Sequence, residues 1–201
     1  RYGVLLDMYR RNCGAHRGEL GHQLFLMRQL QNCSDIVKQA KTKEEIKIVL
    51  KERLDYVNQQ LRDVDVFQLP LDPHMVSTGI VVKECRVMGS KMQPIWLVFE
   101  NAMDHDQPHV VMFKAGDDLR QDQLTLQVIH VMDTLWQAEG FDFCMNDYKC
   151  VSTGWLQGML QIVQNASTVA MIVAEGAEKR TGYKGKKLAR AAAKDALWNK
   201  R

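Results

Sequence analysis

The sequence lacks the features that mark membrane, secreted and disulfide-bonded proteins. It contains no run of about eighteen apolar residues, so no transmembrane helix is predicted. Its first residues, RYGVLLDMYRRNCG, mix charges into the apolar positions, so we expect no signal peptide. The cysteines number five and form no C-x-x-C pair. Reduced thiols of a cytosolic protein are therefore expected rather than a disulfide framework.

Familiar catalytic motifs are also missing. There is no G-x-G-x-x-G, no G-x-x-x-x-G-K-[ST], no zinc signature, no nucleophile elbow and no catalytic-triad spacing. Asp104, His105, Asp106 and His109 could suggest a metal site, but nothing else in the sequence has the spacing of metal ligands and this group lies in an expected hairpin loop. We therefore expect no metal site within this chain.

What is present is ordinary globular composition with an uneven charge. Of the 201 residues, 46% are hydrophobic and 25% are charged. Residues 174–201 hold nine Lys/Arg and three Asp/Glu, whereas the rest of the chain is slightly acidic. Tyr183 and Trp198 are too sparse for base stacking, so no nucleic-acid partner is expected. The first residue is Arg and the last lies in a helical pattern, which we interpret as a segment of a longer protein.

The periodicity of the apolar residues predicts an α+β fold. Residues 1–66 repeat at helical spacing, with breaks at Gly14 and at residues 41–43, as in a helical array. The prolines of FQLPLDP end this region, and residues 67–79 are expected to be an extended connector. Strands are then expected at residues 80–88, 95–101 and 110–114, followed by a long helix at 119–139 that Asp118 caps with Gln121 in a capping-box spacing. Three short strands at residues 141–145, 148–152 and 159–163, an ambiguous stretch at 166–172 and a partly helical basic tail at 174–201 complete the prediction.

The most informative segment is VVMFKAGDDLRQDQLTLQ, residues 110–127. A strand delivers Lys114 on the face that it shares with Met112, and a Gly-Asp-Asp turn leads into a helix. Asp118 and Asp122 share one face of the start of this helix, so either of them can balance the lysine. A cation on a strand beside a carboxylate on a helix is typical of a nucleotide-phosphate site.

Three stretches resemble the amino-terminal kinase lobe of phosphatidylinositol 3-kinases. They are ECRVMGSKMQPIWLVFEN, which is similar to the phosphate-binding loop, FKAGDDLRQDQLTLQVIHVMDTLWQAEGFD, and YKCVSTGWLQGMLQIVQNASTVAMI, which leads into the interlobe hinge. LPLDP resembles the link between helical and kinase domains. Residues 1–66 then correspond to the end of a helical domain and residues 80–173 to the small lobe with its hinge. KAGDDLRQD resembles class II and SKMQPIWLVFEN resembles class I, so the subclass stays open.

The resemblance assigns roles residue by residue. Lys114 matches the lysine that contacts ATP phosphates, and Asp122 and Tyr148 match the carboxylate and tyrosine at the back of the pocket. Ser90 and Lys91 match the phosphate loop. The walls around adenine correspond to Met88, Trp96, Met112 and Leu160, and the hinge to Gln161, Ile162 and Val163. Gln161 stands where many relatives have Glu, which matters little for a main-chain contact.

The resemblance implies a protein-kinase-like small lobe, an antiparallel sheet with one long helix, without the carboxyl-terminal lobe. The expected activity of the whole enzyme is transfer of the ATP γ-phosphate to the 3-hydroxyl of a phosphoinositide. Its cofactors would be ATP and Mg, whose ligands are expected outside this chain. The expected partners are a phosphoinositide lipid and the membrane surface, and a regulatory subunit is a further possible partner. The expected location is the cytoplasm, with recruitment to membranes. A truncated, non-catalytic interaction module and a lipid-kinase-like protein kinase are the alternatives.

Overall fold

The computed structural model describes residues 2–146 and 148–181, and the basic tail beyond residue 181 lies outside them. The chain divides into two compact units, Arg1–Ile162 and Val163–Arg201. The first unit contains helices α1 to α4 and the sheet, whereas the second contains helix α5, Val169–Thr181. None of the helices in the described part of the chain is both long and apolar enough to cross a membrane.

The first unit begins with three helices. They are α1 (Tyr2–Asn12), α2 (His16–Val37) and α3 (Lys43–Gln60). Gly14 adopts a φ of 58° between the first two, where a left-handed conformation favours glycine. Thr42 and Glu45 form a complete capping box at the start of α3, in which the hydroxyl of Thr42 accepts from the Glu45 amide at 3.1 Å. The helical array predicted for this region is confirmed.

A seven-stranded antiparallel sheet follows in the described residues, in the order β1-β2-β4-β5-β7-β6, with β3 paired to β4. The strands are β1 (Phe67–Leu69), β2 (Asp72–Ile80), β3 (Arg86–Val87), β4 (Ile95–Asn101), β5 (His109–Ala115), β6 (Cys150–Gly154) and β7 (Gln157–Gln161). One long helix, α4 (Arg120–Ala138), lies between β5 and β6 in the sequence and contacts β6. The predicted α+β class, an antiparallel sheet with one long helix after a helical array, is confirmed.

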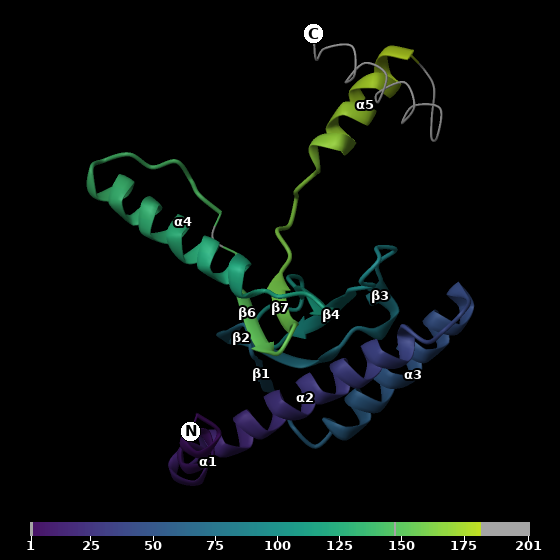
Figure 1. Ribbon diagram of the computed structural model, residues 1–201, viewed down its shortest axis with the longest axis vertical. Coiled ribbons are helices and arrows are strands. Elements are labelled where there is room, and N and C mark those ends of the chain that lie inside the picture. The colour runs from purple at the N-terminus through teal and green to yellow at the C-terminus, as the bar shows by residue number, and fades with distance from the viewer. Residues whose placement is uncertain (1, 147, 182–201) are drawn as a thin grey trace. The chain divides into compact units, whose positions relative to one another are not determined.

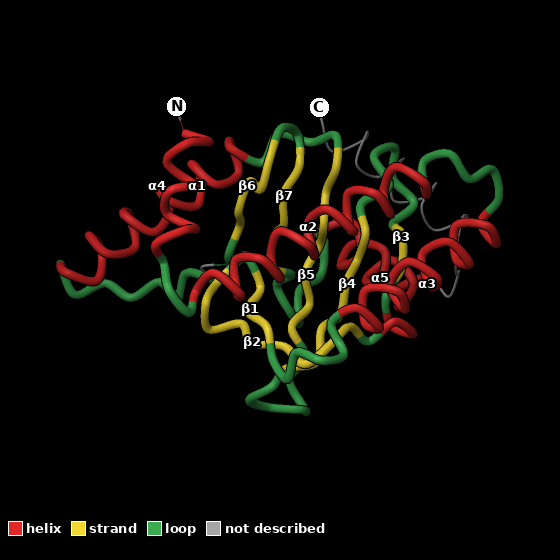
Figure 2. Tube along the Cα trace, turned by 90° about the horizontal axis from the view of Figure 1, so that it is seen from below, coloured by secondary structure: helices red, strands yellow, loops and turns green. Residues whose placement is uncertain are grey.

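Helices α2 and α3 lie side by side across one face of the sheet (Figures 1 and 2). Their apolar residues and those of β1, β2, β4, β5 and β7 form one continuous core. In this core Phe67 and Phe99 meet edge to face with ring centroids 6.3 Å apart. The Asn58 side chain of α3 also donates to the Ile80 carbonyl at 2.8 Å and accepts from its amide at 2.9 Å. The helices are therefore bonded to the sheet as well as packed on it.

Several local predictions are wrong. The strand expected at residues 80–88 is replaced by the end of β2, a 3-10 turn η1 (Val82–Glu84) and the two-residue β3. The residues expected as a connector instead form β1 and most of β2. The expected strand at 141–145 is absent, because Phe143 packs against Trp136 of α4 at 5.0 Å between ring centroids.

The long helix itself is confirmed, and its expected cap is confirmed in part. Helix α4 begins at Arg120, and its N-cap residue, Leu119, makes no side-chain capping bond. The carboxylate of Asp118 accepts from the Arg120 amide at 3.1 Å and also binds the Arg120 guanidinium, but among the described residues the Gln121 side chain makes no reciprocal bond. The face that carries Leu124, Val128 and Leu135 is exposed, and Leu126 is the buried residue among those of α4 that the structure describes.

Candidate functional site

The candidate site lies on the face of the sheet opposite α2 and α3. Along β5 the side chains of Val111 and Phe113 are fully buried in the core, whereas Met112 and Lys114 are half-buried on the other side. This alternation places Lys114 where the sequence predicts it, on the same face as Met112. A lysine at this position is available to a ligand that lies over the open face.

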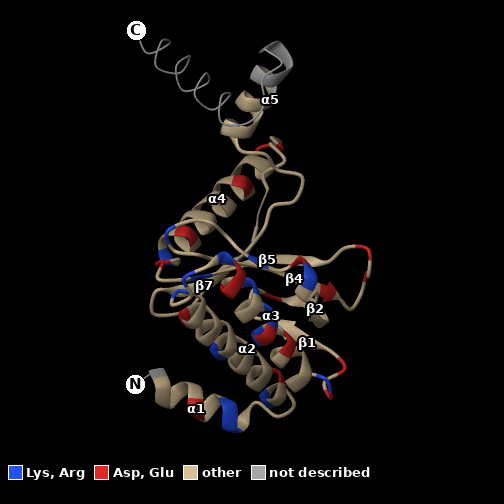
Figure 3. Ribbon diagram, turned by 90° about the vertical axis from the view of Figure 1, so that its right-hand side faces the viewer, with Lys and Arg blue, Asp and Glu red and all other residues tan. Residues whose placement is uncertain are grey.

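Lys114 is paired with an aspartate of the turn that follows it. Its Nζ lies 3.2 Å from Oδ2 of Asp117, and the two side chains are 24% and 46% exposed. The expectation that Asp118 or Asp122 balances the lysine is therefore wrong. Asp118 is bound to Arg120 at 2.6 Å, and this partner lowers the pKa of Asp118 to about 2. Positive and negative charges accordingly lie close together near β7 and the start of α4 (Figure 3).

The turn that carries Asp117 is tightly constrained. Gly116 has a φ of 93°, a conformation that favours glycine. The amides of Gly116 and Asp117 both donate to the Leu156 carbonyl, at 2.6 and 3.2 Å. A side chain added at Gly116 would collide with the methyl group of Met92, so Met92 closes over the turn. These contacts fix the direction in which Asp117 holds the lysine.

The charges of Asp122 and Lys114 both shift the pKa of the Cys150 thiol. Burial raises the pKa of Cys150, the negative charge of Asp122 raises it further, and the positive charge of Lys114 lowers it. Both charges therefore lie near Cys150, although Asp122 itself is exposed on the first turn of α4. Tyr148 is half-buried just before β6. Asp122 thus lies near the same thiol as Lys114, whereas Tyr148 precedes Cys150 and lies farther from Ser152, the β6 residue in line with Lys114.

The predicted phosphate-loop residues form a turn between β3 and β4. The Gln93 amide donates to the Ser90 carbonyl at 3.1 Å, and the Met88 amide donates to the Pro94 carbonyl at 2.9 Å. Ser90 and Lys91 are exposed in this turn. Because Met92 of the same turn contacts Gly116, the loop is joined to the segment just after Lys114.

Three of the predicted adenine walls form a row across three strands, and Cys150 of β6, which was not predicted, extends this row to a fourth. Trp96 of β4 is paired with Met112 of β5, Met112 with Leu160 of β7, and Leu160 with Cys150 of β6. Directly opposite residues share one face of an antiparallel sheet, so these side chains form a single half-buried apolar strip. Arg86 of β3 covers Trp96, with its Cζ 4.2 Å from the ring centroid. Met88, which follows β3, is also half-buried.

The predicted hinge leaves β7. The Ile162 amide donates to the Val110 carbonyl at 3.0 Å, and the Gln161 amide donates to the Lys149 carbonyl at 2.7 Å. The Gln161 side chain accepts from the Lys149 amide at 3.2 Å, a contact that sequence reasoning missed. Val163 begins the second unit and is half-buried.

Three further residues support the site and were not predicted. Asp117 pairs with Lys114, Gly158 lies opposite Lys114 on β7, and Lys38 at the end of α2 donates to the Ala115 carbonyl at 2.9 Å. Of these three residues, only Asp117 could be inferred from the sequence, because it belongs to the Gly-Asp-Asp motif. Among the described residues, no group of three or more His, Cys, Asp and Glu side chains is arranged to hold a metal ion.

Comparison with known proteins agrees with the motifs in this site. Residues 109–199 match the family described as "Phosphatidylinositol 3- and 4-kinase". "Phosphatidylinositol 3-kinase 2" of Dictyostelium discoideum is 46% identical over 172 residues, which cover 86% of this chain and 9% of that protein. "Phosphatidylinositol 3-kinase 1" of the same organism is 39% identical over 185 residues, which cover 92% of this chain and 12% of that protein. The chain thus spans only a small part of the length of these relatives.

Proposed function

We propose that this chain, which belongs to the phosphatidylinositol 3-kinase family, supplies the ATP-binding small lobe of a lipid kinase. The whole protein would transfer the γ-phosphate of ATP to the 3-hydroxyl of a phosphoinositide. The observation that carries this proposal is the position of Lys114. It lies on the same face of the sheet as the apolar strip, two residues beyond Met112 along β5, with Asp117 at 3.2 Å.

Each part of the site has a distinct task in this proposal. The apolar strip of Trp96, Met112 and Leu160 would hold the adenine ring, whose flat faces suit half-buried apolar side chains. The main chain at Gln161–Val163 would pair with the polar edge of the ring. Because the Gln161 side chain already accepts from Lys149, it is positioned within the protein rather than toward a ligand. The choice of Gln at this position is then compatible with a main-chain contact.

The phosphates would lie between Lys114 and the turn that contains Ser90 and Lys91. Phosphoryl transfer depends mainly on orientation and on stabilisation of charge, because the protein adds little covalent chemistry. Asp117 would keep the Lys114 ammonium in place without neutralising it fully, since this carboxylate is 46% exposed to water. Asp122, whose charge lies near Cys150 of the strip, would complete the back of the pocket together with Tyr148.

Magnesium would accompany ATP and neutralise its phosphates when bound. The two aspartates of the turn, Asp117 and Asp118, are each paired with a cation, and the described residues contain no metal-ion cluster. These residues do not fit a magnesium site by themselves. We propose that its ligands lie outside this chain.

The lipid substrate, the membrane surface and a regulatory subunit are the proposed partners, and the proposed location is the cytoplasm with recruitment to membranes. The support is the family membership, because relatives with this sequence pattern carry the name phosphatidylinositol 3-kinase. Helices α2 and α3 and the lobe would act as one body in the first unit, since they share a core.

The test is Lys114→Met in the full-length protein, measured as phosphorylation of phosphatidylinositol vesicles by labelled ATP. We expect a loss of turnover on the order of 100-fold or more, the magnitude typical for removal of a group that stabilises transition-state charge. The fold should survive, because a partly exposed ion pair contributes only about 0–1 kcal/mol. Lys83→Met, at an exposed position of η1, is the matched control and should retain activity. Near-normal turnover by the Lys114 variant would contradict the proposal.

A further inference from the structure

A second candidate binding site lies on the opposite side of the sheet from Lys114. It is a pocket of about 530 Å³ within the first unit, formed between α1, α2, the β1–β2 turn and the β6–β7 hairpin. Thr153 lines it, whereas its neighbour Ser152 lies opposite Gly158 and hence on the face of Lys114. The pocket is therefore separate from the proposed ATP site, and its volume falls in the range that suits a single small molecule.

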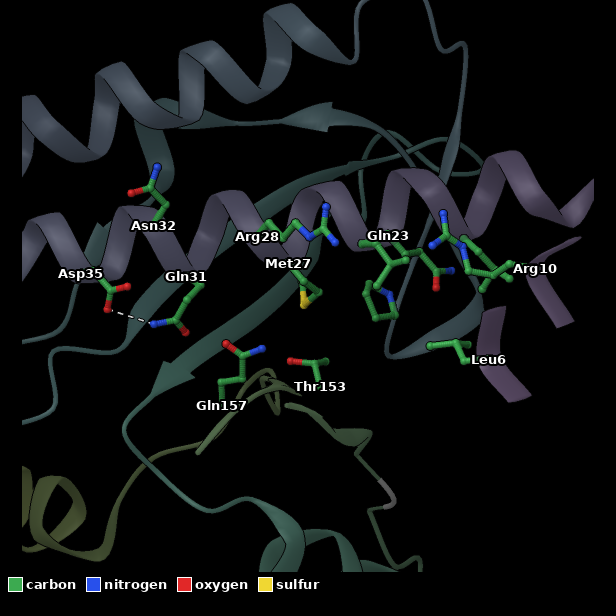
Figure 4. A pocket seen from close by; sticks show the side chains of 13 residues that line it. Leu6, Arg10, Gln23, Met27, Arg28, Gln31, Asn32, Asp35, Thr153 and Gln157 are labelled. Carbon is green, nitrogen blue, oxygen red and sulfur yellow. Dashed lines mark hydrogen bonds between the residues drawn. The ribbon is translucent and has the colours of Figure 1, made fainter. Parts of the chain in front are cut away.

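Two polar atoms at this pocket lack a hydrogen-bond partner in the part of the chain that the structure describes. The Nε of Arg10 and the hydroxyl of Thr153 are buried, and neither forms a hydrogen bond with the described residues. Buried polar groups in native proteins are nearly always satisfied by protein, water or ligand. These two atoms come from α1 and from β6, far apart in the sequence, and both residues line the same pocket (Figure 4).

The charge of the lining favours an anion. Arg10 and Arg28 bring two positive charges, and neither forms an ion pair with a described residue within 4.0 Å. The acidic residue of the lining, Asp35, already accepts a hydrogen bond from Gln31 at 2.9 Å. A guanidinium group is suited to bind a carboxylate through parallel N–H···O bonds.

The rest of the lining is largely apolar. Leu6, Leu20, Leu24, Met27 and Pro70 contribute to it, and Thr153 and Gln157 lie across the pocket from Met27 (Figure 4). A strongly hydrated dianion such as inorganic phosphate would leave these side chains uncovered. A molecule with one carboxylate and an apolar body satisfies both halves of the surface.

We propose that this pocket binds a small amphipathic carboxylate, with the carboxylate on Arg10 and the apolar body against α2. Such a ligand would join α1 to the β6–β7 hairpin, whereas in the present structure α1 makes its main contacts with α2 alone. Binding should therefore protect α1 from hydrogen exchange. This inference is independent of the proposed kinase activity.

The experiment uses octanoate, octylamine and octanol as probes of equal chain length and different charge. Binding to the full-length protein is measured by calorimetry, and protection of α1 by hydrogen–deuterium exchange with mass spectrometry. We expect octanoate to bind at least 10-fold more tightly than octylamine and to slow exchange in residues 2–12. Excess ATP should leave octanoate binding unchanged, because the two sites lie on opposite faces of the sheet.

Variants of neighbouring arginines make the test specific. Arg10→Leu should remove the preference for octanoate over octanol, and Thr153→Val should weaken octanoate several-fold. Arg11→Leu is the matched control, because Arg11 is 72% exposed and paired with Asp7 at 2.8 Å. Equal binding of octylamine, competition by ATP, or an Arg10→Leu variant that is folded and still prefers octanoate would each overturn the proposal. If Arg10→Leu fails to fold, the Thr153→Val result decides the question alone.

Discussion

Gly158 offers a sharp test of how closely the strands around Lys114 are packed. It lies on β7 between Lys114 of β5 and Ser152 of β6. A Cβ built on Gly158 would be 2.6 Å from Cδ1 of Leu119, 3.1 Å from the Ser152 Cα and closer still to the Val151 carbonyl oxygen. Two of these three neighbours are backbone atoms, which cannot turn aside as a flexible side chain can. Gly158→Ala must therefore displace β6 relative to β7.

The expected cost follows from the packing of a filled interior. Forcing one additional carbon into a closely packed site typically destabilises a protein by about 1–3 kcal/mol. The same displacement moves the strand that holds β5 in register, and hence Lys114. A transition-state loss of about 1.4 kcal/mol corresponds to a 10-fold fall in kcat/KM. We therefore expect Gly158→Ala to reduce kcat/KM for ATP by roughly one order of magnitude.

Gly79→Ala is the matched control, since Gly79 is also a strand glycine, on β2. Its added Cβ would meet only Oδ1 of Asn58 at 3.5 Å, an ordinary van der Waals contact. Replacement of a glycine at a permissive position stabilises a protein by about 0.4–1 kcal/mol, because the unfolded chain loses freedom. Hydrogen exchange of the β6 and β7 amides, with steady-state kinetics in ATP, measures both variants. If Gly158→Ala exchanges and turns over like Gly79→Ala, the account of strand packing is refuted.

Two further predictions concern Lys38 and the thiols. Lys38→Met removes the 2.9 Å hydrogen bond to the Ala115 carbonyl, so the KM for ATP should rise several-fold with little change in kcat. Lys38→Arg should restore part of the ATP affinity. An unchanged KM in Lys38→Met would contradict the positioning role of Lys38. Burial raises the pKa of Cys33 and of Cys85 to about 11, so iodoacetamide at pH 8 should label exposed Cys144 first and these two thiols only as the pH rises toward 11. The two buried thiols contribute fully to the free energy of unfolding below the ordinary thiol pKa, and this contribution is lost as the pH rises through about 11. Unfolding measured across that pH range would test this.

Elements with a clear period were predictable from the sequence. The helix over Lys43–Gln60 follows from its apolar spacing and from Thr42 and Glu45, which form the capping box. The strand that carries Lys114 follows from strict alternation, and the buried Val111 and Phe113 confirm which side faces the core. Local sequence is sufficient here because both the period and the cap are encoded within a few residues.

Strand predictions failed where apolar residues alternate in the sequence but pack against an element other than a neighbouring strand. Val82 and Cys85 are three residues apart, and both pack against the core from a 3-10 turn rather than from a strand. Phe141 and Phe143 alternate as in a strand, yet Phe143 packs against Trp136 of α4 at 5.0 Å between ring centroids. Such a pattern has the period of a strand but lacks a neighbouring strand, which the sequence alone does not reveal.

The partner of Lys114 depended on a single boundary. A helix that began at Leu119 would make Asp118 its cap and leave Asp122 to face the lysine. The helix begins at Arg120 instead, and Arg120 takes Asp118 through two side-chain bonds of 2.8 and 2.6 Å. Asp117 then remains in the turn, three residues after Lys114, and reaches back to it. Helix boundaries are uncertain by one or two residues in any sequence-based prediction, and here one residue decides the ion pair.

Helix α2, which precedes the sheet, can influence the proposed ATP site through its contacts with β5. Val111 and Phe113 bury the back of β5 in the core that includes α2, so movement of this helix would open a cavity behind the strand. At the end of β5 the α2 residue Lys38 holds the Ala115 carbonyl, one residue beyond Lys114. Core packing holds β5 in position against α2, whereas this one hydrogen bond orients the turn that follows β5. Loss of the bond should therefore leave the fold in place and misalign the ammonium of Lys114, which is why Lys38→Met is expected to weaken ATP binding rather than to unfold the protein.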